Sequence, residues 1–270
     1  MNIEGKKALV LGGYGLVGMA VCRELLERRP REIQIHSLRQ EESEEARGQL
    51  LPFAGETRMT VSSGDIFGPV DKETTDLDRL GQQLCQLRDE DLPLFLLYHL
   101  LAEGRPEIVI DCVNTATGIA YRDVYSSSEK VFQQVAADAV DRADVEALLE
   151  ALYIPRLIRH IQVLYRGMSD AKTGVYFKVG TSGTGGMGLN VPYTHSEEKP
   201  SRVLLSKSAV AGAHSMLLFL MARTPDAPIT KEIKPAAAIA WKKIAHGPIY
   251  RKREPILLVD AKPRPLGEVF

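Results

Sequence analysis

Short runs of apolar residues alternate along the chain with segments whose apolar residues recur at helical spacing. The apolar runs predict six strands, at residues 8–11, 32–38, 58–62, 108–113, 175–179 and 229–233. The helical spacing predicts helices from residue 16 to about 28, at 92–103, at 206–223, and as one or two long helices over 131–152 and 153–165 that break near Pro155. Strands that are apolar along their whole length and alternate with helices are typical of a parallel sheet covered on both faces.

The pattern therefore predicts an α/β protein with a doubly wound parallel sheet, the Rossmann fold, followed by a short C-terminal extension. Beyond Pro235 the regular alternation is lost and prolines become frequent. We expect a nucleotide-binding domain over residues 1–235, and a partial substrate-side region or extension over 236–270.

The composition is that of a globular protein, and its charge favours neither an acidic nor a basic partner. The 270 residues are 44% hydrophobic and 26% charged, and the 34 basic residues nearly balance the 35 acidic ones. This balance predicts a globular chain whose partner is a small molecule, with no nucleic acid and no membrane. The three cysteines are widely spaced and the start of the chain has no signal-peptide pattern, so we expect reduced thiols, no metal site and a cytoplasmic location.

A glycine-rich turn follows the first predicted strand directly. It reads GGYGLVG, and it satisfies the spacing of Gly12, Gly15 and Gly18 with Tyr14, Leu16 and Val17 between them. Between a strand and a helix, such a turn lets backbone N–H groups approach a pyrophosphate, while the helix N-terminus contributes about half a positive charge. We interpret the turn as a dinucleotide site; the alternative is a purely structural turn.

The end of the second predicted strand bears on the choice of cofactor. An acidic residue usually lies there when the site prefers the ribose 2′-hydroxyl of NAD, but this chain has Ser37 and Arg39. A guanidinium there can pair with a 2′-phosphate. NADP is therefore favoured and NAD is possible, although Arg39 can also be a side chain that only packs at a strand end.

With these segments in this order, the sequence resembles the short-chain dehydrogenase/reductase superfamily, most nearly its extended branch of epimerases, dehydratases and reductases. The resemblance spans residues 5–235 and rests on the glycine turn, GDI at 64–66, VNTATG at 113–118, the Ser/Thr-rich end of the fifth strand and SKSAVAGAH at 206–214. It implies that Asp65 and Ile66 border the adenine, and that Asn114, Thr115 and Ala116 line the nicotinamide half. It also implies that Thr181 or Ser182 orients the substrate and that Lys207 bonds the nicotinamide ribose.

One position departs from the family pattern. The family has a catalytic tyrosine four residues before the lysine, where this chain has Val203. Valine cannot transfer a proton, so another group must act as the acid or base, or the usual chemistry has been lost. Tyr193 is the nearest candidate in sequence and His195 is a second, although both residue types in such a loop are more often packing residues.

Two functions from different classes remain open at this point. The first is an NADP-dependent oxidoreductase or epimerase/dehydratase-like enzyme with an atypical acid or base and an unidentified small-molecule substrate. The alternative is a non-catalytic dinucleotide-binding sensor or scaffold. The resemblance further implies a homodimer in which the long helices of residues 131–165 and 206–223 pair across a two-fold axis.

Overall fold

The computed structural model describes residues 2–71, 75–119, 123–180, 202–233, 250–251 and 254–255. Of residues 116, 117, 203, 204, 208, 250, 251, 254 and 255 it describes the backbone alone. Six strands form one parallel sheet in the order β3-β2-β1-β4-β5-β6. They are β1 (Lys7–Leu11), β2 (Glu32–Ser37), β3 (Arg58–Ser63), β4 (Ile108–Asp111), β5 (Val175–Val179) and β6 (Ile229–Ile233). The doubly wound parallel sheet predicted from the sequence is confirmed.

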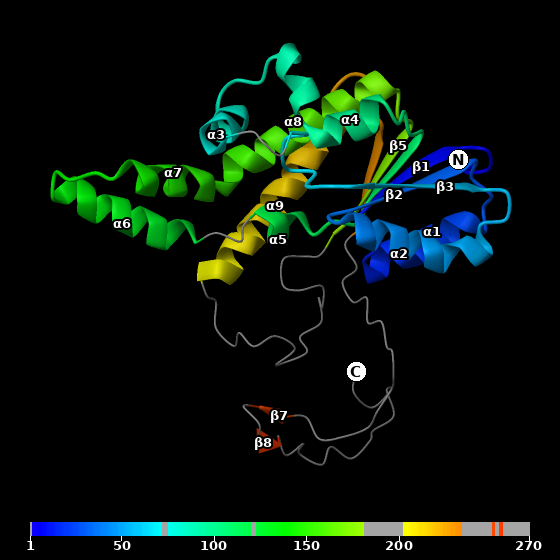
Figure 1. Cartoon of the computed structure of the whole chain (residues 1–270), viewed down its shortest axis with the longest axis horizontal. Coiled ribbons are helices and arrows are strands. Elements are labelled where there is room, and N and C mark those ends of the chain that lie inside the picture. Colours follow the sequence, from blue (N-terminus) through cyan, green and yellow to red (C-terminus); the bar gives the residue numbers. More distant parts are fainter. Residues whose placement is uncertain are drawn as a thin grey trace, which may run out of the picture.

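Helices cover both faces of this sheet (Figure 1). On one face lie α1 (Leu16–Leu26) and α2 (Gln40–Leu50); on the other lie α4 (Leu96–Ala102), α8 (Tyr153–Ala171) and α9 (Arg202–Ala222). The remaining elements are η1 (Leu51–Phe53), α3 (Asp76–Leu84), η2 (Asp89–Leu94), α5 (Thr115–Ile119), α6 (Val124–Ala136), α7 (Arg142–Ala151), and the short antiparallel pair β7 (Tyr250–Arg251) and β8 (Glu254–Pro255).

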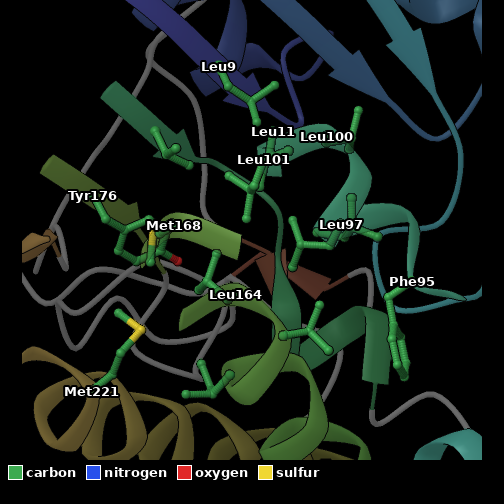
Figure 2. Packing of buried hydrophobic residues seen from close by; sticks show 14 of the residues in the cluster. Leu9, Leu11, Phe95, Leu97, Leu100, Leu101, Leu164, Met168, Tyr176 and Met221 are labelled. Atoms are coloured by element: carbon green, nitrogen blue, oxygen red, sulfur yellow. The ribbon is translucent and has the colours of Figure 1, made fainter. Parts of the chain in front are cut away.

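Alternate residues of each central strand supply two hydrophobic cores. Ala8 and Val10 face the core under α1 and α2, whereas Leu9 and Leu11 face the core under α4, α8 and α9. Figure 2 shows this second core, where leucines of α4 meet Leu164 and Met168 of α8 and Tyr176 of β5. Because both faces of β1 are buried from Ala8 to Leu11, its sequence is apolar over these four residues, as expected for a strand in the middle of a parallel sheet.

The region between β4 and β5 differs from the sequence-based prediction. Pro155 was expected to interrupt a long helix, but it lies in the first turn of α8, where its missing N–H has no intrahelical acceptor to lose. One break occurs at Leu152, where the predicted segments 131–152 and 153–165 meet, and a second break, which was not predicted, follows Ala136, where Asp138 has a φ of +53°. As a result α6 and α7 form a helical hairpin that projects from the sheet-containing body (Figure 1).

The segment Leu205–Ala222 of α9 is long and apolar enough, by length and composition, to cross a membrane, with a mean hydropathy of 1.3. One such helix is weak evidence, since core helices of globular proteins pass the same test. In this fold Val210, Leu218 and Met221 of α9 are buried against the protein interior.

Strand order locates the place where a ligand is expected. The chain proceeds outward from β1 to β2 and β3, then returns to place β4 on the other side of β1. Loops at the carboxyl ends of β1 and β4 therefore leave the sheet toward opposite faces, and ligands of open α/β sheets bind at such a switch point. The glycine turn follows β1 at this edge.

Candidate dinucleotide site

Backbone hydrogen bonds hold the glycine turn against the end of β2. The N–H groups of Gly12 and Gly13 both donate to the His36 carbonyl, at 2.9 and 3.0 Å. Gly12 has a φ of +74°, which favours glycine. A Cβ on Gly18 would come within 2.7 Å of the Gly13 Cα and still closer to the Gly12 carbonyl oxygen. Gly12 and Gly18 are therefore required by the fold of the turn itself.

Gly15 is under a different constraint. Its φ of −61° and ψ of 159° are open to any residue, and a Cβ there would meet only the Gly12 carbonyl oxygen at 3.5 Å, an ordinary contact. The protein itself therefore leaves room for a side chain at this exposed position. The fold of the turn itself therefore does not require a glycine at position 15.

The N-terminus of α1 presents free donors beside Gly15. The first intrahelical bond runs from Met19 N to Gly15 O, at 2.8 Å, so the N–H groups of residues 16–18 precede the helical ladder. Among the described residues no side chain caps this end, and Leu16 is 89% exposed. An uncapped helix N-terminus next to a glycine turn can hold a phosphate through its N–H groups and its dipole.

The end of β2 supplies Ser37 and Arg39, as the sequence suggested. The Ser37 hydroxyl accepts a hydrogen bond from Tyr14 N at 3.2 Å, and Ser37 is only 4% exposed, so its side chain braces the glycine turn. Arg39 is exposed at the start of α2, where its N–H donates to the Glu42 carboxylate. The Arg39 side chain is therefore accessible to a ligand at this strand end.

Asp65 and Ile66, which the resemblance placed together beside the adenine, differ in exposure at the end of β3. Asp65 is exposed, and its carboxylate accepts a hydrogen bond from Phe67 N at 3.0 Å. Ile66 is 6% exposed and packs in the core with Phe95 and Leu97. Between them and β2, Gly64 N donates to Ser37 O at 3.1 Å, which joins this loop to the glycine turn.

A buried polar cluster that the sequence analysis missed lies at the ends of β4 and β5. The Lys178 ammonium lies 2.9 Å from Asp111 Oδ2, and the Tyr176 hydroxyl donates to the same oxygen at 2.9 Å. All three residues are at most 2% exposed. Their signal in the sequence was a charged residue inside each of two apolar strands, IVID and VYFKV, since such residues are almost never buried unless they are paired.

Burial and pairing act in opposite directions on this cluster. Complete burial opposes ionisation of Asp111, but the Lys178 charge, with hydrogen bonds from Lys178 and Val113 N, holds the pKa of Asp111 below its ordinary value. Burial and the neighbouring Asp111 carboxylate raise the pKa of Tyr176 well above 10. Asp111 is therefore ionised and Tyr176 is protonated at neutral pH.

His160 of α8 lies next to this cluster without a hydrogen bond of its own. Its ring packs 4.7 Å from the Phe67 ring and 6.3 Å from the His214 ring, between centroids. Both ring nitrogens are buried with no partner among the described residues. Burial lowers the pKa of His160 to about 4, with Asp111 opposing and Lys178 adding to the shift. The imidazole is therefore neutral at physiological pH.

We expect His160 to make the folded state sensitive to acid. Its folded pKa of about 4 lies below the ordinary histidine pKa of 6.5, so between these pH values the unfolded chain binds more protons and stability falls as the pH falls. His160→Leu should remove up to about 3 kcal/mol of this loss. Urea unfolding between pH 4 and 7 measures it, with Phe67→Leu as the control that alters the same packing without removing a titrating group. An unchanged pH slope in His160→Leu would contradict the assignment.

The other predicted site residues lie on or beyond the remaining elements. Asn114 is exposed and its carbonyl accepts from Gly118 N at 2.9 Å, while Thr115 is 3% exposed and its hydroxyl lies 3.1 Å from Lys178 Nζ. Lys207 is half-buried near the start of α9. The side chains of Ala116 and Val203 lie outside the described residues, as do Thr181, Ser182, Tyr193 and His195.

No family profile matches the sequence, and no curated protein matches it either. Among solved structures, the chain is similar to a 3-oxoacyl (acyl-carrier-protein) reductase from Agrobacterium tumefaciens with NADP bound, at a TM-score of 0.50 and 14% identity over 86% of this chain and 70% of that one. An NADH-dependent reductase complexed with NAD gives a TM-score of 0.49 and 13% identity over 86% and 78%. Pen from Bacillus thuringiensis gives 0.45 and 10% over 85% of this chain and 49% of that one. The first of these similarities supports the Rossmann-like fold.

Proposed function

We propose that this chain binds a nicotinamide dinucleotide, NADP in preference to NAD, and acts as an oxidoreductase or epimerase/dehydratase-like enzyme of the short-chain dehydrogenase/reductase type. The observation that carries the proposal is the uncapped N-terminus of α1 beside Gly15, at the switch point between β1 and β4. A glycine that the fold itself does not require, next to free N–H donors, fits a bound pyrophosphate. The solved reductase of the same fold contains NADP, which agrees with a nicotinamide dinucleotide as the ligand.

Different residues of the chain would bind different parts of the cofactor. The N–H groups of Leu16, Val17 and Gly18 would hold the pyrophosphate, and Arg39 would pair with a 2′-phosphate through two N–H donors. Lys207 would donate to the nicotinamide ribose, as the resemblance implies. The bound cofactor supplies or accepts a hydride at its nicotinamide ring.

A proton must move when the hydride moves, and Val203 cannot carry it. Our hypothesis assigns this step to Tyr193, with His195 as the alternative, so that one of them gives a proton to the oxygen of a carbonyl substrate during reduction. The valine at position 203 also favours a second candidate function. In that case the chain binds the dinucleotide as a sensor or scaffold without turnover.

Two measurements on the purified chain separate these functions. Calorimetric titration with NADP and NAD tests binding, and loss of NADPH absorbance with a panel of small aldehydes and ketones tests turnover. The enzyme hypothesis predicts turnover that falls at least about 100-fold in Tyr193→Phe, in the range for loss of an acid or base. Binding without turnover on any substrate would support the sensor, and no binding of either cofactor would overturn both functions.

Arg39 should determine which cofactor is preferred. Arg39→Ala is expected to weaken NADP binding about 10- to 100-fold, as for loss of a charge-assisted hydrogen bond, and to leave NAD binding nearly unchanged. Arg47→Ala is a matched control, because Arg47 lies on the same helix and pairs with Glu44 on its exposed surface. Equal losses for NADP and NAD, measured by calorimetry, would contradict the role of Arg39.

A further inference from the structure

Lys178 makes more contacts with the loop after β4 than its pairing with Asp111 requires. Its ammonium lies 2.6 Å from the Val113 carbonyl oxygen and 3.1 Å from the Thr115 hydroxyl, in addition to the 2.9 Å contact with Asp111. Three acceptors match the three protons of an ammonium group. Two of the three lie beyond the sheet, Val113 in the turn after β4 and Thr115 at the first position of α5.

The same turn is held from its other side by Asp111. Asp111 Oδ1 accepts from Val113 N at 2.9 Å, and Thr115 N donates to the Val113 carbonyl at 2.9 Å. Both polar groups of the Val113 backbone are therefore bound within the cluster. The Lys178–Asp111 pair therefore fixes the position of the Val113 backbone through these hydrogen bonds.

Val113 in turn touches the glycine turn. A Cβ on Gly12 would lie 3.2 Å from both Cys112 C and Val113 N, so the two loops that flank the switch point are in close backbone contact. Adenosine is expected on the β2 side of this switch point, where Arg39 lies, and the second nucleotide on the β4 side. The turn held by Lys178 forms the β4 side.

Stability alone does not explain a charge pair at this place. Replacing a buried ion pair by apolar residues of similar size is often neutral or stabilising, and the strands around Lys178 and Asp111 are apolar. A fixed ammonium supplies a definite loop geometry that an apolar side chain does not. The pair is therefore better explained by the position of the loop than by the stability of the sheet.

We propose that Lys178 is a positioning residue for the nicotinamide half of the dinucleotide, acting through the turn at residues 113–115. The inference rests on the proposed function and assigns to Lys178 no contact with the cofactor. It predicts that loss of the ammonium weakens binding of the whole dinucleotide but spares binding of its adenosine half.

The test uses the double variant Lys178→Met with Asp111→Asn, which leaves no unpaired charge in the interior. Calorimetry should show NADP affinity reduced about 10-fold, equivalent to one lost hydrogen bond, with the affinity for 2′,5′-ADP within about 2-fold of wild type. Tyr176→Phe is the matched control, because it removes the other hydrogen bond to Asp111 and leaves the contacts of Lys178 with the turn. It should bind both ligands as the wild type does.

A second variant covers the case in which the double variant does not fold. Thr115→Val keeps the shape of the side chain and removes only the hydroxyl near Lys178, and it should weaken NADP about 3-fold without affecting 2′,5′-ADP. Wild-type NADP affinity in a folded double variant, or equal losses for both ligands in either variant, would overturn the positioning role. A wild-type chain that binds neither ligand would overturn the proposed function itself, which is a separate and visible result.

Discussion

Gly15→Val should abolish tight cofactor binding while leaving the protein as stable as the wild type. The Cβ finds only an ordinary 3.5 Å contact within the protein, but the side chain occupies the space through which a pyrophosphate would reach the N–H groups of α1. Loss of one or two charge-assisted hydrogen bonds corresponds to about 3 kcal/mol, or roughly 100-fold in affinity for NADP. Calorimetry measures the affinity and thermal unfolding measures the stability.

Two other glycines show whether this effect is specific. In Gly18→Ala the added Cβ meets the backbone of Gly12 and Gly13, so both stability and binding should fall, the former by about 1–3 kcal/mol as for overpacking. In Gly48→Ala the Cβ meets nothing within 4 Å on the exposed side of α2, so binding should stay and stability should rise by up to about 1 kcal/mol. Unchanged NADP affinity in Gly15→Val would mean that the glycine turn is only structural.

The second large effect is expected at Asp111. Asp111→Ala leaves the Lys178 ammonium and the Tyr176 hydroxyl buried without their shared acceptor. Breaking a buried ion pair from one side costs about 3–5 kcal/mol in the free energy of unfolding, which urea denaturation at pH 7 would show. The paired variant Lys178→Met with Asp111→Asn should recover most of this loss, because no charge then remains buried without a partner.

Two controls test this prediction: the loss of an exposed ion pair, and a change of pH. Glu24→Ala breaks an exposed pair between Glu24 of α1 and Arg28, which follows the end of that helix, and should cost less than about 1 kcal/mol. Because the folded pKa of Asp111 lies below the ordinary aspartate pKa of 3.8, its contribution to stability is present above that pH and is lost as the pH falls through the folded pKa. A loss below about 1 kcal/mol in Asp111→Ala at pH 7 would show that the pair contributes little to the fold.

The sequence by itself determined the sheet and the glycine turn after β1, because both depend on local patterns. Apolar runs such as that of β1 identify strands buried on both faces, and the spacing of Gly12, Gly15 and Gly18 reflects the turn between one strand and the next helix. The position of Arg39 also follows from its distance along the chain. The helical hairpin of α6 and α7 was less predictable, because a proline in a first helical turn and a break at Asp138 leave almost the same pattern of apolar residues.

Only the tertiary structure decided which residues act together. It divided the glycines into Gly12 and Gly18, which the turn itself requires, and Gly15, which it does not. It also brought Lys178 next to Asp111, 67 positions earlier in the chain, through the register of β4 and β5. A charged residue within an apolar strand marks a buried pair, but its partner lies on a neighbouring strand and is set by pairing over long separations, which no local pattern contains.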